Sequence, residues 1–250
     1  MVYTLAGLGV ADKAARQAIA RAGAAGWIES ERDGRRTAWR ISARGRQLIT
    51  AGSQRIRSLY SNPDEWDGTW MLLHISLPTS RRGDRLRLYR ALSWIGFGNP
   101  NPGIWICPHA HRADEARRVI AAMHLSEHTL AWTSRSLDFG LPLPQLVARA
   151  WDLARVAEYY HALVKRFSAI HPRTDDAVLF AHVELVNALQ RLPSVDPGLP
   201  HALLPPKWDS DQQAKKLIAL RHAWHDQAHA RWRELSAELV GQPARRIPRA

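Results

Sequence analysis

The sequence predicts an α+β protein made of three modules. A helical pattern followed by a β-hairpin signal opens the chain, strand and helix patterns alternate in its middle, and long amphipathic helical patterns fill its end. A chain of 250 residues exceeds one average domain, which favours more than one module. We place the modules at residues 1–62, 63–140 and 141–250, with the proline-punctuated stretch Leu141–Pro144 at the last boundary.

The composition is that of a folded, basic protein. Hydrophobic residues make up 46% of the chain and 11 residues are tryptophan, which argues against disorder. The formal net charge is +12, and more than half of this excess lies in residues 1–60. A basic surface favours polyanions such as nucleic acid, acidic lipid or phosphorylated ligands. The charge distribution therefore points to the first module as the binding module.

The sequence also predicts a compartment. No stretch approaches the roughly 20 uninterrupted apolar residues that a membrane-spanning helix needs, and no secretion signal opens the chain. The one cysteine, Cys107, excludes an internal disulfide framework and suits a reducing environment. We therefore expect a cytoplasmic protein that does not contact a membrane.

The first module begins with an expected helix over residues 11–25 that has two unlike faces. Small apolar residues, among them Ala15 and Ile19, fall on one face, which can pack closely against a partner. The long polar side chains of the opposite face are those of Lys13, Arg16, Gln17 and Arg21. Such a face can enter the major groove of DNA and read base edges.

A β-hairpin follows this helix. Residues 27–31 and 37–41 alternate in polarity and are joined around Asp33-Gly34, a strong hairpin signal. The cationic residues of this hairpin are Arg32, Arg35, Arg36 and Arg40. A third helical pattern covers residues 42–59. This order is that of a winged helix-turn-helix, in which a helix reads bases and the wing contacts phosphates.

The beginning of this module departs from the usual pattern. Residues 1–9 leave room for the end of one helix and a turn, where a winged helix-turn-helix normally has a full helix. Either the module is abbreviated, or the chain starts upstream of Met1. A DNA-silent relative that keeps only ligand binding or dimerisation is therefore one alternative function.

The middle module alternates strands and helices. Strands are expected within residues 67–78, 103–108 and 128–137, and a turn precedes the second of them. Helices are expected within 80–98 and 112–124. This β-α-β…α-β order favours a ferredoxin-like unit.

The last module is expected to be helical. One long helix is predicted over 145–167, another over 174–192, and two further helices between 212 and 240. These helices would supply a second core and a dimer surface.

Several segments together resemble a known family. They are GTWMLLHISLP, GFG followed by PGIWICP, DPGLPHALLPPKW, and the helix-hairpin stretch AARQAIARAGAAGWIESERDGRRTAWRIS. The chain is similar in these segments to the PaaX-like family of phenylacetate-catabolism repressors. The resemblance implies a winged helix, a ferredoxin-like domain and a helical C-terminal domain. It also implies a homodimeric repressor that leaves double-stranded operator DNA on binding an aryl- or acyl-CoA thioester.

The densest basic run of the middle module is a candidate effector site. Arg81, Arg82 and Arg85 belong to this run and could meet the phosphates of a CoA ligand or of flanking DNA. The competing interpretation is an exposed basic face whose charge is offset by nearby acids.

The middle module also resembles small ferredoxin-like CRISPR-associated proteins, some of which are metal-dependent nucleases. Their key aspartate closes the first strand, where this chain has His74. Because Mg²⁺ prefers carboxylate oxygen, this alternative loses its main residue.

No pattern requires a metal, a cofactor or an enzyme. His222, His225 and His229 share one expected helix face with Asp226, and such spacing can bind Zn²⁺, but polar members of a surface helix are the simpler interpretation. Structural use is likewise favoured for Cys107, His109 and His111. The chain has no phosphate-binding glycine loop, no G-x-S-x-G and no H-E-x-x-H. We therefore expect a regulator with no catalytic residues.

Overall fold

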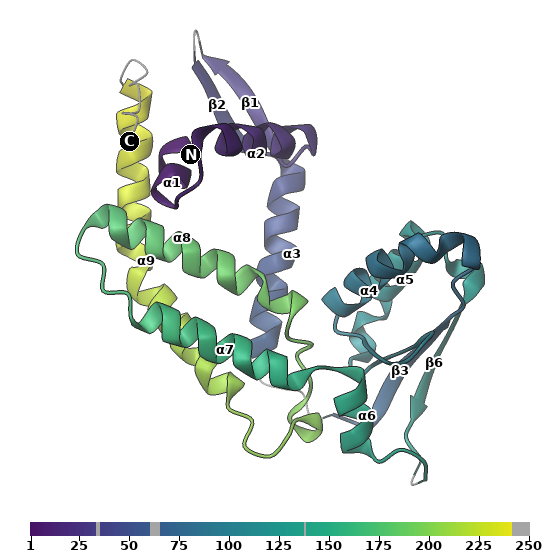
Figure 1. Cartoon of the computed structure of the whole chain (residues 1–250). Coiled ribbons are helices and arrows are strands. Elements are labelled where there is room, and N and C mark those ends of the chain that lie inside the picture. Colours follow the sequence, from purple (N-terminus) through teal and green to yellow (C-terminus); the bar gives the residue numbers. More distant parts are fainter. Residues whose placement is uncertain (34–35, 61–65, 138, 242–250) are drawn as a thin grey trace. The chain divides into compact units, whose positions relative to one another are not determined.

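The computed structural model describes residues 1–33, 36–60, 66–137 and 139–241 (Figure 1). In this part of the chain, helices accompany one two-stranded and one four-stranded sheet, as the predicted α+β class requires. The chain forms two compact units. The first holds residues 1–52, 163–189 and those from Lys215 onwards, and the second holds 53–162 and 190–214.

The first unit begins with the predicted helix–hairpin–helix order. Its elements are α1 (Val2–Gly7), α2 (Asp12–Ala24), β1 (Ile28–Asp33), β2 (Arg36–Ile41) and α3 (Ala43–Tyr60). β1 and β2 pair antiparallel, with Ile28 opposite Ile41. Ser42 caps α3, because its Oγ accepts a hydrogen bond from the backbone N–H of Gly45 at 2.9 Å and donates to the carbonyl of Gly26 at 2.6 Å.

Small residues let the hairpin lie close to α2. Ala15 is fully buried on the inner face of this helix. A Cβ atom added at Gly23 would lie 3.0 Å from the indole of Trp39, which extends from β2. The close approach of Trp39 therefore depends on glycine at position 23, and it ties the hairpin to the helix.

The first unit also contains α8 (Asp175–Gln190) and most of α9 (Ser210–Gly241). Thr174 caps α8 by accepting a hydrogen bond from the backbone N–H of Ala177 at 3.2 Å. The two helices predicted between 212 and 240 are one helix, so that prediction was wrong. No proline or glycine interrupts residues 211–240, and nothing in their sequence stops the helix.

The second unit is built on an antiparallel sheet of four strands. They are β3 (Thr69–Ile75), β4 (Gly98–Asn101), β5 (Ile104–Cys107) and β6 (Thr129–Arg135), in the order β4-β5-β3-β6. The 3₁₀ turn η1 (Thr79–Asp84) and α4 (Arg85–Trp94) connect β3 to β4, and α5 (Ala113–Ala122) connects β5 to β6. Alternate residues of β3, such as Leu73, pack in one buried core with Leu92 of α4 and Ile120 of α5.

One strand of this sheet was not predicted from the sequence. β4 occupies most of the segment NPNPG, for which we expected a turn. Proline lacks a backbone N–H and is tolerated on an edge strand, which is where Pro100 lies. The pairing of β4 with β5 also shifts register between Gly98 and Asn101.

The helix predicted over 145–167 is two helices. α6 (Leu143–Ala150) ends at Trp151, whose backbone is extended, and α7 (Leu153–Ser168) follows. The Asp152 carboxylate begins α7 by accepting the backbone N–H of Arg155 at 3.1 Å. The indole of Trp151 is buried and stacks on that of Trp70 with ring centroids 6.2 Å apart. This packing interrupts the helix.

Candidate DNA-binding surface

The predicted reading face of α2 is present as an exposed surface. Lys13, Arg16, Gln17 and Arg21 are all exposed, and no large apolar side chain lies between them. Ala15, on the opposite side of the helix, is buried. Periodicity alone placed these four side chains correctly on one face, because α2 is a regular helix from Asp12 to Ala24.

Arg16 has a partner within its own helix. Its Nε lies 2.7 Å from Oδ2 of Asp12, and its Nη2 lies 3.2 Å from Oδ1. Both side chains are exposed, so this i,i+4 ion pair contributes little to stability and is screened by salt. The guanidinium can therefore exchange Asp12 for a phosphate or a base at small cost.

The predicted wing is described only in part. Arg40 is exposed, and its Nη2 lies 3.0 Å from Oε2 of Glu31 on the neighbouring strand. Arg35 and the side chains of Arg32 and Arg36 lie outside the described residues. Of the four hairpin arginines that we predicted to contact phosphates, Arg40 is therefore the one whose side chain the structure describes.

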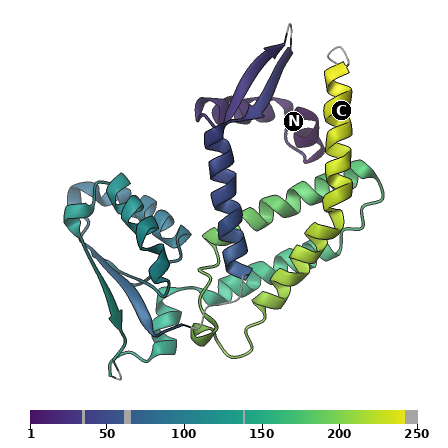
Figure 2. The same cartoon turned by 180° about the vertical axis from the view of Figure 1, so that it is seen from behind.

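The short N-terminal helix is tied to the C-terminal helices of its unit. Figures 1 and 2 both show α1 beside α9. A Cβ atom added at Gly7 of α1 would lie 2.1 Å from the ring of Phe180 in α8, so the two helices are in close contact. This contact with α8 holds α1, the short first helix of the first module, in place.

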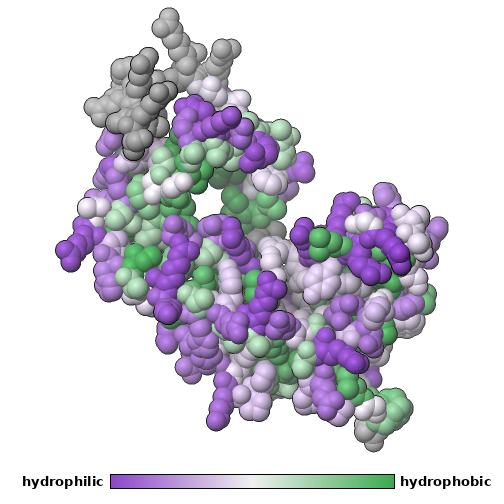
Figure 3. Space-filling view, viewed as in Figure 1, coloured by the Kyte–Doolittle hydropathy of each residue, from purple (hydrophilic) through white to green (hydrophobic). Residues whose placement is uncertain are grey.

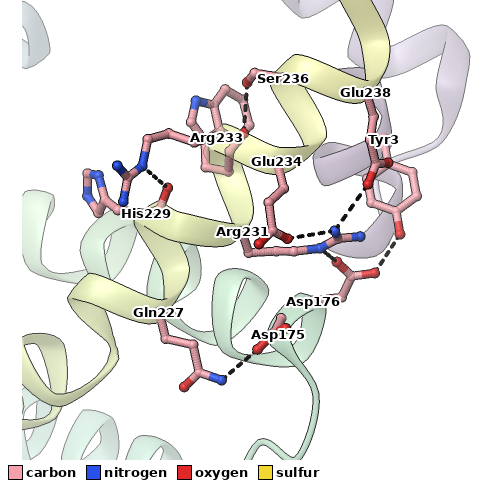
Figure 4. A network of polar contacts seen from close by, with 11 residues as sticks. Tyr3, Asp175, Asp176, Gln227, His229, Arg231, Arg233, Glu234, Ser236 and Glu238 are labelled. Atoms are coloured by element: carbon pink, nitrogen blue, oxygen red, sulfur yellow. Dashed lines mark hydrogen bonds and ion pairs between the residues drawn. The ribbon is translucent and has the colours of Figure 1, made fainter. Parts of the chain in front are cut away.

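A polar cluster, which we call the Asp176 network, joins the three helices (Figure 4). The hydroxyl of Tyr3 donates to Asp176 Oδ2 at 2.7 Å, and Nε of Arg231 donates to Oδ1 at 2.6 Å. Arg231 also contacts Glu234 at 3.1 Å. The Arg231 guanidinium, and then the Tyr3 hydroxyl, hold the pKa of Asp176 below its usual value. Sequence reasoning missed this network, because residues 3, 176 and 231 share no local pattern.

A histidine cluster lies between α8 and α9. The ring centroid of His182 is 5.9 Å from that of His225 and 5.8 Å from that of His229, and the latter two rings stack at 4.2 Å. Within the described residues, no group of three histidine, cysteine or acidic side chains is placed to hold a metal ion. The sequence had paired His225 and His229 with His222, whereas the buried member is His182.

The histidine cluster is expected to make the protein less stable in acid. Burial, and then the neighbouring His229, lower the pKa of His182 from 6.5 to about 4, and Arg221 and His225 act in the same direction. Between pH 6.5 and 4 the unfolded chain therefore binds more protons than the folded one, and the free energy of unfolding falls as the pH is lowered. The loss approaches about 1.4 kcal/mol per pH unit.

Urea denaturation at several pH values measures this effect. His182→Phe is expected to flatten the slope between pH 6.5 and 4.5, whereas the matched control His171→Phe, at an exposed position, leaves it unchanged. An unchanged slope in His182→Phe would show that other groups cause the acid sensitivity.

The three arginines of the candidate effector site differ in their surroundings. Arg81 donates twice to Asp84, and also to the carbonyls of Met123 at 2.8 Å and His124 at 3.1 Å. It joins η1 to the end of α5, a structural contact. Arg82 and Arg85 are exposed. They are therefore the members of this set that are better placed to meet a phosphate.

Two of the sequence segments noted above meet at a buried arginine. Arg112 is 2% exposed, and its Nη1 donates to the carbonyls of Ile95 at 3.0 Å and Pro197 at 3.2 Å. It therefore bridges the residue directly before the GFG segment and the DPGLP segment. Asp196, the first residue of the DPGLP segment, accepts hydrogen bonds from the Tyr160 hydroxyl and the Gly198 N–H, both at 2.7 Å. Burial raises the pKa of Asp196.

The remaining candidate residues have structural surroundings. Cys107 is fully buried in the sheet core. Nε2 of His109 hydrogen-bonds with the carbonyl of Gly198 at 2.7 Å, which again joins the sheet to the DPGLP loop. Among the helices of the described part of the chain, none combines the length and apolar character that crossing a membrane requires.

Models of known protein families match most of the chain. Three family models match: "PaaX-like protein" over residues 1–45, "PaaX protein central Cas2-like domain" over 63–144, and "PaaX-like protein C-terminal domain" over 151–234. The Transcriptional repressor PaaX of Escherichia coli (strain K12) is 26% identical over 216 residues. That match covers 82% of this chain, which spans 66% of the relative's length. The relative is a regulator and not an enzyme.

A solved structure shares the fold. It is the uncharacterized protein Rv0674 from Mycobacterium tuberculosis, which superposes with a TM-score of 0.57 at 21% sequence identity. The match covers 92% of this chain and 88% of that one.

Proposed function

The chain belongs to the PaaX-like family, and from this membership we propose that it is a DNA-binding repressor of an aromatic-acid catabolic operon of the phenylacetate type. The observation that carries the proposal is the exposed cationic face of α2 beside the hairpin, in a chain whose Escherichia coli relative is named a transcriptional repressor. A repressor acts where the DNA is, so the cytoplasm is the compartment that we propose.

We assign a winged helix-turn-helix to residues 1–62, a ferredoxin-like domain to 63–140 and a helical domain to 141–250. The helix–hairpin–helix order of α2, β1, β2 and α3 supports the first assignment. The second is supported by the connectivity β3-α4-β4-β5-α5-β6 with β3 and β5 central in the sheet.

In the proposed complex, α2 lies in the major groove. Arginine and glutamine can make paired hydrogen bonds to guanine and adenine edges, which gives Arg16, Gln17 and Arg21 the role of base readers. Lys13 and the hairpin residues Arg32, Arg35, Arg36 and Arg40 contact phosphates and set the register of the protein on the duplex.

The repressor is a homodimer that an aryl- or acyl-CoA thioester releases from its operator. Arg82 and Arg85, and with them Arg81, supply cationic groups for the effector's phosphates. The effector lowers the affinity for the operator by favouring a second arrangement of the two DNA-binding modules. By thermodynamic linkage, bound operator DNA lowers the affinity for the effector by the same factor.

A mobility-shift assay tests the proposal with DNA from upstream of the protein's own gene. Arg16→Ala combined with Arg35→Ala is expected to weaken operator binding at least about tenfold. The number of counterions released on binding, which is read from the salt dependence of the affinity, is expected to fall by roughly one to two. The matched control is Arg117→Ala combined with Arg118→Ala, which removes two exposed charges from α5. That control is expected to bind like the wild type.

Two outcomes would contradict the proposal. Wild-type operator binding by the Arg16→Ala, Arg35→Ala variant would remove the assigned surface. Failure of the wild type to shift any upstream DNA would favour a DNA-silent relative. Adding a panel of CoA thioesters to the wild-type complex then identifies the effector by release of the DNA.

A further inference from the structure

The positive charge of the middle module is gathered on one short segment. Residues 61–140 contain nine arginines and eight acidic residues, so the module as a whole is nearly neutral. Five of the nine arginines lie within residues 81–90, where the one acidic residue is Asp84. A patch of one sign concentrates an electrostatic field that attracts the opposite charge. The segment is therefore a candidate for contact with a polyanion.

α4 carries two arginines of this segment on its open side. Arg87 and Arg90 are exposed and lie three residues apart, which places them on one helix face with about 5–6 Å between their Cβ atoms. The helix packs into the core through other residues, Leu88 and Leu92. α4 contains no acidic residue. Among the residues that the structure describes, neither Arg87 nor Arg90 forms an ion pair, so both guanidinium groups are available to a partner.

Other arginines of this unit are compensated by acidic side chains. Arg81 pairs with Asp84 at 2.7 Å. On α5, Arg117 pairs with Asp114 at 2.6 Å, and Glu115 adds a second negative charge to the first turn of that helix. The arginine pair on α4 therefore differs from the mixed-charge surface on α5 of the same unit.

Two apolar side chains are exposed beside these arginines. Leu86 is 56% exposed and Trp94 is 38% exposed. Each lies four residues from Arg90, so all share one helix face. Figure 3 shows mostly hydrophilic residues, with hydrophobic ones between them, at the upper right over α4 and α5. We call Leu86, Arg87, Arg90 and Trp94 the α4 surface.

The shape and chemistry of the α4 surface favour a nucleic-acid backbone as its partner. Sites for small molecules are concave and enclose most of the ligand, whereas this surface is the open side of a helix. Successive phosphates of one DNA strand lie about 3.4 Å apart along the duplex axis, within the combined reach of two arginines one turn apart. Leu86 has no group that could hydrogen-bond to a base edge, but it can pack on the sugars between phosphates.

We propose that the α4 surface is a second DNA-binding surface, which contacts the phosphate backbone of duplex DNA without reading its sequence. It lies in the second unit, whereas the base-reading face of α2 lies in the first. Arg82 and Arg85, which we assigned to the effector, are not spaced at three or four residues from both Arg87 and Arg90, so they do not belong to this pair. The inference rests on the DNA binding of the proposed function and adds a surface to it.

Fluorescence anisotropy of the full chain with two duplexes of equal length, the operator and a random sequence, measures this contact. Arg87→Ala combined with Arg90→Ala is expected to weaken binding to both duplexes by the same factor, at least about fivefold, because phosphate contacts carry no sequence information. The number of counterions released on binding is expected to fall by roughly two. Arg87→Lys combined with Arg90→Lys is expected to keep most of the affinity, because lysine also binds phosphate.

Arg117→Ala combined with Arg118→Ala is the matched control, since it removes the same charge from exposed positions of α5. It is expected to bind both duplexes like the wild type, and circular dichroism confirms that all variants fold. Wild-type binding by the Arg87→Ala, Arg90→Ala variant, an equal loss in the α5 control, or a loss confined to the operator would each overturn the proposal.

The preference for operator over random sequence separates this inference from the proposed function. Arg16→Ala, which removes a base reader, is expected to lower that preference, whereas the Arg87→Ala, Arg90→Ala variant keeps it. A wild type that binds neither duplex would contradict the proposed function itself. A wild type that prefers the operator, together with an α4 variant that loses no affinity, would overturn the α4 surface alone.

Discussion

Gly96→Ala is expected to destabilise the second unit by about 3 kcal/mol. Gly96 has φ +90°, a backbone conformation that costs energy for any residue with a Cβ atom. A Cβ atom there would lie 2.1 Å from Nη1 of Arg112 and 2.9 Å from the carbonyl oxygen of Pro197. The Arg112 side chain is buried and cannot move into solvent, so the substitution breaks its bridge between the GFG and DPGLP segments.

Urea denaturation followed by tryptophan fluorescence measures this loss, because Trp70 and Trp151 are buried in the same unit. Gly83→Ala is the control. Position 83 has ordinary backbone angles and no neighbouring atom within 4 Å of an added Cβ, so its stability should change little. Equal midpoints for the two variants would show that the Arg112 bridge does not stabilise the fold.

Asp176→Ala is expected to loosen α1 and to destabilise the first unit by about 2 kcal/mol. The substitution removes the acceptor of both Tyr3 and Arg231, and leaves a largely buried guanidinium without its shortest ion pair. Hydrogen bonds to charged groups are among the stronger ones, so their loss exceeds that of an ordinary surface contact.

Thermal unfolding reports the loss of stability, and hydrogen exchange reports its location. The amides of α1 are expected to lose protection in Asp176→Ala while those of α4 keep theirs. Asp114→Ala is the control, because Asp114 forms an exposed ion pair with Arg117. Unchanged exchange in α1 would mean that its contact with Phe180 holds the helix without the Asp176 network.

The candidate DNA-binding surface was predictable because its pattern is local. The cationic face of α2 follows from the helical period, and Asp33-Gly34 between alternating residues indicates the hairpin. The Arg16–Asp12 pair is also an i,i+4 spacing that the sequence displays. What supports this surface was not predictable, because Gly7 and Phe180, or Tyr3 and Asp176, are far apart in the chain.

The errors in element boundaries have a common cause. β4 was mistaken for a turn because proline and glycine dominate its sequence, although an edge position removes the objection to Pro100. The break between α6 and α7 lies at Trp151, an apolar residue that continues the helical pattern. Its indole packs on Gly98 and Trp70, and this contact, which no local rule contains, ends the helix.

By itself, the sequence determined the α+β class, the helix–hairpin–helix order of the first module, the basic charge and the residues that form the exposed face of α2. These depend on period, turn chemistry and charge, which act over a few residues. Only the tertiary structure decided that α1 is held by α8 and α9, that His182 joins His225 and His229, that Arg112 bridges two distant segments, and that β6 is left as a free edge. Each of these is a contact between residues distant in sequence, and folding brings such residues together through burial that no single segment specifies.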